Sequence, residues 1–275
     1  MQLNQVFIRS ILKPRRPGSH KGQNGRVLVA GGSSTYYGSP ALVAKAALRA
    51  GADLAYLLVP ERIADVIASY SPDFIVCAYR GGRLNGSALP VFRRLVEKTD
   101  AMVIGNGITK EKGALRAAQK LASSWPKNKP LVIDADCIGS VYRPNSVYTP
   151  HVVEFKRLSG KMPAENIDKR AGQVRALAKK LNAVVLLKGK IDVISDGARV
   201  ALNSTGNAGM THGGTGDTLA GICGAFLARN HSSFNSACLS AYVNGSAGDL
   251  AYEEFGPGLL ASDLIERIPE AVRKL

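Results

Sequence analysis

The sequence predicts an α/β protein in which a mostly parallel central sheet is covered by helices on both faces, giving three α/β/α layers. From residue 27 to about residue 187, short apolar runs alternate with segments of helix-like amphipathic spacing. Strands of parallel sheets are buried on both faces, so they read as unbroken apolar runs, and helices connect them. No linker, repeat or low-complexity stretch interrupts this order. We therefore predict one α/β domain.

The predicted strands are apolar runs that end at glycine or polar residues. Gly31 follows the first run, and the next helix is marked by Ser39 as N-cap, Pro40 in its first turn and Gly51 at its end. The predicted strands are Val27–Ala30, Leu54–Val59, Phe74–Ala78, Ala101–Ile104, Leu131–Ile133 and Val184–Leu187, and helices are predicted at 41–50, 88–98, 111–124 and 165–181.

The order changes near residue 190. Ile191–Ser195 and Arg199–Leu202 flank the turn dipeptide Asp196-Gly197, which predicts a β-hairpin. Three more helices are predicted at about 217–229, 235–254 and 262–270. We predict that residues 19–275 form the single domain and that residues 1–18 form a basic N-terminal arm.

Composition narrows the class of protein. The chain has 275 residues, 45% of them hydrophobic, which is enough to bury a substantial core. No apolar run reaches the roughly 18 residues of a membrane span, and the N-terminus lacks the pattern of a secretory signal. The four cysteines, Cys77, Cys137, Cys223 and Cys238, form no CxxC pair. Reduced, buried thiols are typical of intracellular proteins, so we predict a cytoplasmic protein without a membrane partner.

The net charge of +15 raises the question of anionic partners. The first acidic residue is Asp53, whereas the leading segment already contains Arg9, Lys13, Arg15, Arg16, Lys21 and Arg26. Such an arm can bind nucleic acid through phosphates, but the remaining charge is spread along the chain without a reader motif. We favour attraction of small anions, or solubility. A non-catalytic nucleotide- or nucleic-acid-binding protein is kept as a separate hypothesis.

The glycine-rich stretch Asn203–Asp217 is the strongest functional signal. It ends in one acid, Asp217, and runs into a helical pattern. Glycines let successive N–H groups face one ligand, and a helix N-terminus adds partial positive charge, which suits phosphates or a transferring phosphoryl group. Asp217 is then placed to accept a proton from a hydroxyl. The alternative is an ordinary glycine turn with Asp217 as N-cap. Neither a Walker lysine nor a dinucleotide fingerprint is present.

Glycine or acidic residues follow other predicted strands, at the edge where open α/β sheets bind ligands. Gly31–Gly38 and Ile104–Gly107 each follow a strand and permit close backbone approach. Asp134 and Asp136 follow Leu131–Ile133, and their spacing would point both carboxylates the same way if the strand continued. Such a pair suits Mg²⁺ or acid/base work. The alternative in each case is an ordinary turn or strand end.

Histidine and lysine mark two further candidate sites. His151 and Glu154 follow Thr149 at a spacing of one helical turn, so His151 can contact a ligand while Glu154 caps the helix, or both simply form a capping box. Lys188 ends the run Val184–Leu187 and can reach a phosphate or extend to solvent. No histidine pairing resembles a zinc site, and no nucleophile elbow supports Ser-His-Asp catalysis.

Together these segments resemble the NAD(P)H-hydrate dehydratase family, whose members have a ribokinase-like fold. The resemblance covers residues 19 to about 270, and the ordered set of motifs is highly specific although each motif is modest. The motifs are Ser19–Gly25 with its His-Lys-Gly, Gly38-Ser-Pro, Ala46–Ala52, Ile104–Gly107, Ile133–Asp136, Thr149–Phe155, Leu187-Lys-Gly189, Thr205-Gly-Asn, Gly213–Gly221 and Asn244–Asp249.

The resemblance implies an activity that composition cannot show. This activity is the nucleotide-dependent dehydration of the S-epimer of NADH hydrate and NADPH hydrate to NADH and NADPH. The ring hydroxyl is phosphorylated and phosphate then leaves. ADP is favoured over ATP as the donor, and Mg²⁺ is held mainly by the nucleotide phosphates, with no protein ligand assigned. The alternative is a kinase of the same fold acting on a vitamin-precursor alcohol.

The resemblance also implies roles for individual residues. Asp217 is the expected catalytic base, and amides around Gly214–Gly216 are expected to stabilise the transferring phosphoryl group. The nucleotide is expected to contact Lys188, Gly189, Lys190, Ile191, Asp192, Asn207, Gly214, Thr215 and Gly216. The hydrate is expected to contact Gly38, Ser39, Gly107, Asp134, His151 and Asp217.

The chain departs from the family pattern near the expected hydrate pocket. The departures are Val152-Val153 for the usual Pro-Gly, Ser39 in place of alanine in Gly-Ala-Pro, Cys137-Ile-Gly after Asp-Ala-Asp, and Met210-Thr-His212 before the terminal glycines. The epimerase domain often fused ahead of this one has no counterpart, so we expect a separate epimerase as functional partner. The resemblance further implies a homo-oligomer, with a tetramer as the candidate.

Overall fold

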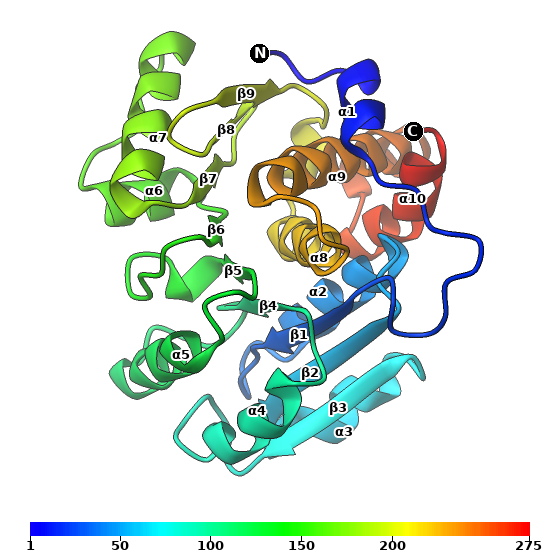
Figure 1. The fold of residues 1–275 in the computed structure, drawn as a ribbon, viewed down its shortest axis with the longest axis vertical. Coiled ribbons are helices and arrows are strands. Elements are labelled where there is room, and N and C mark those ends of the chain that lie inside the picture. The colour runs from blue at the N-terminus through cyan, green and yellow to red at the C-terminus, as the bar shows by residue number, and fades with distance from the viewer.

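A single sheet runs through the protein in the strand order β3-β2-β1-β4-β5-β6-β7-β8-β9. The computed structural model describes residues 1–275. The strands are β1 (Arg26–Ala30), β2 (Leu54–Pro60), β3 (Phe74–Tyr79), β4 (Ala101–Ile104), β5 (Leu131–Ile133), β6 (Val147–Tyr148), β7 (Val184–Leu187), β8 (Asp192–Ser195) and β9 (Val200–Asn203). Neighbours from β3 to β7 pair parallel, and β8 is antiparallel to β7 and β9. The predicted three-layer, mostly parallel α/β fold is confirmed (Figure 1).

Helices cover both faces of this sheet because each strand directs alternate side chains to opposite sides. In β1, Val27 and Val29 enter one apolar cluster while Leu28 and Ala30 enter the other. The first cluster includes α1 (Gln5–Ile11), α2 (Gly38–Arg49), α3 (Glu61–Ser69), α8 (Thr215–Ala228), α9 (Ser233–Phe255) and α10 (Ala261–Arg273). The second includes α4 (Ala88–Val96), α5 (Lys112–Ser124), α6 (Val152–Ser159) and α7 (Ile167–Leu181).

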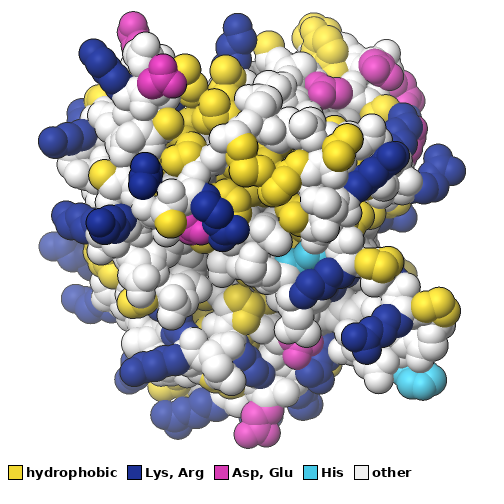
Figure 2. All heavy atoms as spheres, turned by 45° about the horizontal axis from the view of Figure 1, so that its top comes forward, with side chains coloured by type: hydrophobic (Ala, Val, Ile, Leu, Met, Phe, Trp, Pro, Cys, Tyr) yellow, Lys and Arg dark blue, Asp and Glu magenta, His cyan; other side chains and the backbone are white.

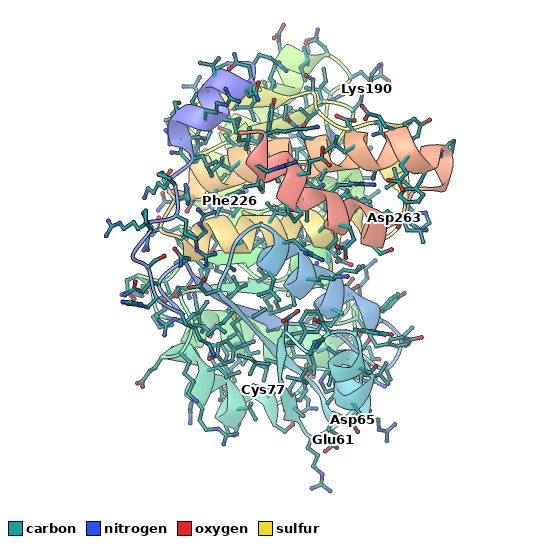
Figure 3. The ribbon with its side chains drawn as sticks, turned by 90° about the vertical axis from the view of Figure 1, so that its right-hand side faces the viewer. Glu61, Asp65, Cys77, Lys190, Phe226 and Asp263 are labelled. Carbon is teal, nitrogen blue, oxygen red and sulfur yellow. The ribbon has the colours of Figure 1, made fainter.

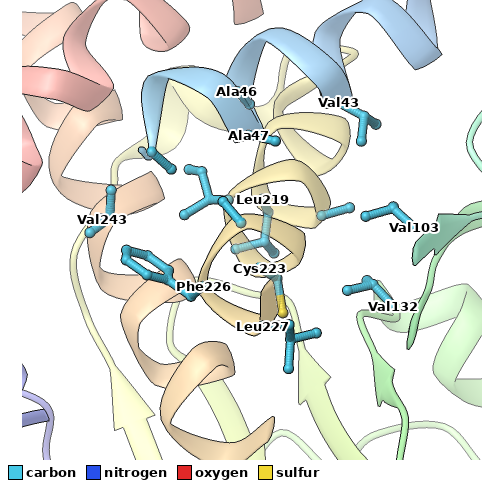
Figure 4. Packing of buried hydrophobic residues seen from close by; sticks show 14 of the residues in the cluster. Val43, Ala46, Ala47, Val103, Val132, Leu219, Cys223, Phe226, Leu227 and Val243 are labelled. Carbon is cyan, nitrogen blue, oxygen red and sulfur yellow. The ribbon is translucent and has the colours of Figure 1, made fainter. Parts of the chain in front are cut away.

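Helix α8 lies at the centre of the first cluster. Every residue from Thr218 to Ala228 is buried, so this helix is enclosed on all sides rather than amphipathic. Figure 4 shows Leu219 and Cys223 of α8 between α2 and the sheet. The backbones of α2 and α8 approach closely at Gly221, where a Cβ atom would lie 2.2 Å from the carbonyl oxygen of Val43.

Each helix and strand predicted from the sequence is present, with ends shifted by a few residues. Among the helices and strands, α1, α3 and β6 were not predicted, and α6 was expected only as a helix start at His151 and Glu154, without an end. Strand β6 has two residues, too few to produce a pattern. Helix α3 begins directly after Pro60, the last residue of β2, without a side-chain cap to mark its start. Short elements of this kind depend on tertiary packing rather than on local sequence.

The N-terminal segment lies against the domain. Residues around Gln2 run beside β9, where the amide of Leu3 donates to the carbonyl of Leu202 at 2.8 Å. Ile8 of α1 is fully buried in the first apolar cluster. On the face in Figure 2, lysine and arginine side chains are dispersed rather than gathered in one patch. The boundary at residue 18 stays a prediction.

The four cysteines form no disulfide. Three of them are buried, and Cys77 is half-buried in the edge strand β3. Figure 3 shows Cys77 and Lys190 toward opposite ends of the sheet. None of the helices combines the length and the apolar character that a bilayer crossing requires.

We predict that Gly221→Ala destabilises the protein, because the added methyl group would overlap the α2 backbone at Val43. Overpacking of this kind costs about 1–3 kcal/mol of unfolding free energy. Chemical denaturation monitored by circular dichroism measures the loss. Gly172→Ala on the exposed face of α7 is the matched control, since nothing lies within 4 Å of its Cβ position, and it should stabilise the protein by up to about 1 kcal/mol. Equal stability of Gly221→Ala and the wild type would contradict the close packing.

Candidate active site

The first turn of α8 presents free backbone amides. Gly214 is the N-cap and adopts a left-handed φ of 98°, which favours glycine. The first amide to bond back is that of Thr218, to the carbonyl of Gly214 at 3.0 Å. The amides of Thr215, Gly216 and Asp217 make no hydrogen bond within the protein, and no side chain caps them. This helix end is therefore an anion-binding position.

Asp217 belongs to this first turn and does not cap the helix, so the N-cap alternative from the sequence is wrong. Its carboxylate instead faces the sheet, where Oδ1 accepts a hydrogen bond of 2.6 Å from Nδ2 of Asn106. Burial raises the pKa of Asp217 to about 6, which hydrogen bonds from Asn106 and Ser39 oppose and the nearby charge of Asp134 reinforces. A carboxylate with such a pKa is ionised at neutral pH and still basic enough to take a proton.

Asn106 links Asp217 to a second carboxylate. The same Nδ2 atom donates to Oδ2 of Asp134 at 2.9 Å. Asp134 is 2% exposed, and its Oδ1 accepts from Thr149 Oγ1 at 2.7 Å. Asn106 was expected only as part of the turn Ile104–Gly107, and neither Asn106 nor Thr149 was among the predicted site residues. Their positions after β4 and β6, where parallel strands end, are the signal that could have identified them.

Lys188 supplies the positive charge of this group. Its Nζ lies 3.2 Å from Oδ1 of Asp134 and 3.9 Å from Oε2 of Glu154. A Cβ atom placed on Gly216 would lie 3.2 Å from the same Nζ, so the ammonium group also lies beside the first turn of α8. Burial would lower the pKa of Lys188, but the two carboxylates outweigh it and raise the pKa. A permanent cation therefore adjoins the free amides.

His151 and Glu154 form the capping box that the sequence suggested. His151 is the N-cap of α6, its Nδ1 accepts from the amides of Val153 and Glu154, and its own amide donates to Oε2 of Glu154 at 2.9 Å. Burial and the nearby Lys188 lower the pKa of His151. Burial raises the pKa of Glu154 to about 7, although Lys188 opposes the shift. The His151 side chain remains about half exposed and so can contact a ligand.

The glycine turns after β1 and β4 meet at this site. A Cβ atom on Gly107 would lie 2.7 Å from the carbonyl oxygen of Tyr36 and 3.2 Å from Cβ of Ser39. Gly38 and Ser39 are the first residues of α2, whose N-cap is Tyr37, so the prediction that Ser39 is the N-cap is wrong. Pro40 still falls in the first turn, where no amide hydrogen is needed. The structure thus brings Gly38, Ser39 and Gly107 together.

The segment after β7 forms a tight turn. The amide of Gly189 donates to Oδ1 of Asp192 at 3.0 Å, and Asn203 donates to Oδ2 at 3.0 Å. Burial raises the pKa of Asp192 to about 6. Lys190 is exposed and Ile191 half-buried, so both are open to a ligand.

The side chains of two other predicted nucleotide contacts, Asn207 and Thr215, already form hydrogen bonds within the protein. Asn207 donates to Oδ1 of Asp249 at 2.9 Å and accepts from the amide of Gly209. The Thr215 hydroxyl donates to the carbonyl of Met210 at 2.7 Å. No hydrogen bond joins Asn207 to the group around Asp217. These side chains shape the loop, and the backbone of Thr215 remains open at the helix end.

Asp134 and Asp136 do not act as a pair. The strand stops at Ile133, and a 3₁₀ turn follows in which Ala135 has a φ of 51°. Asp134 therefore faces Asn106, whereas Asp136 accepts from the amide of Thr109 at 3.1 Å. No group of three or more His, Cys, Asp or Glu side chains is arranged to hold a metal ion.

A large cavity of about 730 Å³ lies away from this group, between α5 and residues 140–145. Its lining includes Arg143, whose guanidinium already donates to the carbonyls of Trp125 and Pro126. The chemistry of the site around Asp217 therefore identifies it better than cavity size does.

Comparison with solved structures defines the class of protein. The fold matches a ribokinase-like superfamily protein from Enterococcus faecalis with a TM-score of 0.88 at 24% identity, over 99% of this chain and 95% of the other. It also matches the ADP/ATP-dependent NAD(P)H-hydrate dehydratase of Bacillus subtilis, co-crystallised with ATP and Mg²⁺, with a TM-score of 0.85 at 26% identity over 98% and 97% of the two chains. The fold is ribokinase-like.

Sequence comparison then identifies the family. The family model described as NAD(P)H-hydrate dehydratase matches residues 27–270. An ADP-dependent (S)-NAD(P)H-hydrate dehydratase from Cenarchaeum symbiosum is 39% identical over 273 residues, which is 97% of this chain and 94% of that protein. A bifunctional NAD(P)H-hydrate repair enzyme from Pyrobaculum aerophilum is 42% identical over 264 residues, 94% of this chain and 53% of that protein. The chain belongs to the NAD(P)H-hydrate dehydratase family. It spans about half the length of the bifunctional relatives that it matches.

We predict that Glu154→Gln weakens the pH dependence of stability. The pKa of Glu154 rises from 4.5 in the unfolded chain to about 7 in the fold, so the folded state binds this proton more tightly. The resulting stabilisation is complete below about pH 4.5 and is lost as the pH rises through 7. It amounts to about 3 kcal/mol at most.

Denaturation of wild type and Glu154→Gln at several pH values tests this expectation. The wild type should lose more unfolding free energy than the variant between pH 4.5 and 8. Glu253→Gln on the exposed surface of α9 is the control and should behave like the wild type. Parallel stability curves for wild type and Glu154→Gln would contradict the prediction.

Proposed function

We propose that the protein dehydrates the S-epimer of NADH hydrate and NADPH hydrate to NADH and NADPH, with ADP favoured over ATP as phosphoryl donor. Membership of the NAD(P)H-hydrate dehydratase family supports the reaction class. The name of the Cenarchaeum relative, which is matched over nearly its whole length, supports both the S-epimer and ADP. The observation that carries the proposal is Asp217, a half-buried carboxylate in the same helical turn as three free amides and beside Lys188.

The first step is phosphoryl transfer. Asp217 takes the proton of the ring hydroxyl as its oxygen attacks the terminal phosphorus of the nucleotide, and the bond to the bridging oxygen breaks. The amides of Thr215, Gly216 and Asp217 and the ammonium of Lys188 stabilise the negative charge on the transferring group. Mg²⁺ bound through the nucleotide phosphates would neutralise further charge. The products are the phosphorylated hydrate and a nucleotide shortened by one phosphate.

The second step is elimination. Phosphate is a much better leaving group than hydroxide, so the carbon–oxygen bond breaks as the lone pair of the ring nitrogen forms a double bond to the same carbon. Loss of a proton from the adjacent carbon then restores the dihydronicotinamide ring. The net change is loss of water from the hydrate and hydrolysis of one phosphoanhydride bond, and free phosphate is released.

The proposed ligand contacts form two groups of residues near Asp217, one for the nucleotide and one for the hydrate. We place the nucleotide against Lys188–Asp192, Asn207 and Gly214–Gly216, and the hydrate against Gly38, Ser39, Gly107, Asp134, His151 and Asp217. In support, Gly107 lies against Ser39, and the ammonium group of Lys188 bonds to Asp134 and lies beside Gly216. The exposed Val152 and Val153 beside His151 add an apolar surface where the family usually has Pro-Gly.

A kinase of the same fold is the second candidate. Hydroxyethylthiazole kinase from Pyrococcus horikoshii matches with a TM-score of 0.64 at 18% identity, which supports the shared fold alone. The family match over residues 27–270 favours the dehydratase. A cytoplasmic location, a homo-oligomer with a tetramer as candidate, and a separate epimerase complete the proposal.

We predict that Asp217→Asn lowers turnover by roughly 100- to 10,000-fold, because the amide cannot accept the hydroxyl proton. The fold should persist, since Asp217 caps no helix and pairs with no cation at hydrogen-bond distance. Turnover is measured as the return of reduced-nicotinamide absorbance, and folding as the melting temperature. Asp65→Asn on the exposed side of α3 is the control. Turnover of Asp217→Asn close to the wild-type rate would remove Asp217 from the role of base.

We predict that purified protein converts NADH hydrate to NADH only when a nucleotide is added, with ADP supporting faster turnover than ATP. One phosphate should be released for each NADH formed, because the phosphorylated hydrate eliminates its phosphate. Parallel assays of NADH and phosphate, each with ADP, ATP or neither, measure this ratio. A stable phosphorylated product without NADH would favour the kinase.

A further inference from the structure

Asn106 is the one hydrogen-bond donor that two carboxylates of the site share. Its Nδ2 reaches Oδ1 of Asp217 at 2.6 Å and Oδ2 of Asp134 at 2.9 Å. Both neighbours are acceptors, so the amide nitrogen must face them, because the flipped orientation would place oxygen against oxygen. Asn106 is 1% exposed, and its Oδ1 is buried without a hydrogen-bond partner. The side chain is therefore held in an orientation that leaves its own oxygen unsatisfied.

The backbone of Asn106 is held in place by close contacts with neighbouring strand ends. Its carbonyl accepts from the amide of Gly32 at 2.8 Å. A Cβ atom on Gly31 would lie 2.5 Å from the same carbonyl oxygen, and one on Gly105 would lie 1.9 Å from the carbonyl oxygen of Asp134. The ends of β1, β4 and β5 are thus packed backbone to backbone, so the Asn106 side chain extends from a fixed segment of backbone.

Asp217 faces one like charge and one opposite charge. Asp134, at the end of β5, is a like charge, while Lys188, at the end of β7, is the opposing charge and is bonded to Asp134. Glu154 of α6 lies behind Lys188, 3.9 Å from its Nζ. Helix α2 contributes the uncharged Ser39. Lys188 is therefore shared with two other carboxylates. The hydrogen bonds to Asp217 come from Asn106 and Ser39, and of these two donors Asn106 also reaches Asp134.

We propose that Asn106 is a positioning residue that orients the Asp217 carboxylate and keeps it ionised at neutral pH. The inference rests on the proposed function, in which Asp217 is the base. A hydrogen bond to the charged form of a carboxyl group favours that form, and here it offsets burial and the repulsion from Asp134. Without the amide, Asp217 would bind a proton more readily and lose the basic form that the reaction needs.

Two variants test the role. Asn106→Ala removes the donor, and Asn106→Asp keeps the shape but replaces the donor with an acceptor. The acid limb of the kcat/KM profile should move to higher pH by about one unit for Asn106→Ala and further for Asn106→Asp. Turnover of Asn106→Ala should recover toward the wild-type value above that limb, and KM for the nucleotide should stay unchanged. Activity that falls equally at every pH would overturn the inference, because a purely structural role predicts that result.

A direct titration needs no substrate. Aspartate carboxyl groups labelled with ¹³C are titrated by NMR in the wild type and in Asn106→Ala, and Asp217 is assigned from the signal lost in Asp217→Asn. Asp217 should titrate at higher pH in Asn106→Ala. Asn24→Ala, which removes an amide donor from Asp53 at the other end of β1, is the matched control and should leave Asp217 unchanged.

The activity profile and the titration distinguish failure of the Asn106 inference from failure of the proposed reaction. Identical Asp217 titration in the wild type and Asn106→Ala would overturn the positioning role, whatever the activity. A shifted titration in a protein that never dehydrates the hydrate would support the role of Asn106 toward the carboxylate and sink the proposed reaction instead.

Discussion

One buried and one half-buried carboxylate at the centre of the sheet's carboxyl edge, Asp134 and Asp217, are the constraint on which the site depends. Asp134 and Asp217 would repel one another and lose their solvation, yet the proposed phosphoryl transfer needs at least one of them ionised. The protein meets this requirement with one ammonium group, Lys188, on Asp134 and one amide, Asn106, between the two. Each of these groups comes from the end of a different strand or from the first turn of α8. The proposed phosphoryl transfer therefore requires strands β4, β5 and β7 to end at the same level of the sheet.

Close backbone contact is what brings these ends together. Gly31, Gly105, Gly107 and Gly221 each lie where a side chain would collide with a neighbouring segment. The strand order reverses between β1 and β4, the position at which open α/β sheets bind ligands. The glycines thus serve two purposes. Those in the loops let neighbouring strand ends approach one another, and Gly221 lets α8 lie close enough to α2 to carry Asp217 to this edge of the sheet.

The sequence predicts the scaffold and the ends of its strands better than it predicts the contacts between them. Apolar runs locate the strands because burial on both faces leaves a strong local pattern, and Lys188 is recognisable from its place after such a run. Asn106 is not recognisable in this way. An asparagine between two glycines is typical of a turn, and its role depends on Asp217, which is 111 residues away in the chain. The predicted pairing of Asp136 with Asp134 is wrong for a local reason. Their spacing would point both side chains the same way only if the strand continued, but the chain turns at Ala135.

The enclosure of α8 has a consequence for how the molecule can move. A helix buried along its whole length from Thr218 onward exchanges its amide hydrogens only when most of the domain opens. The edge strands β3 and β9 and the short helix α1 can open locally at far lower cost. Asp217 is thus fixed to the slowest-opening part of the protein, while the turns on either side of it hold the expected ligand contacts. Any rearrangement on binding must come from those turns and from the ligands, with Asp217 as the fixed point of reference.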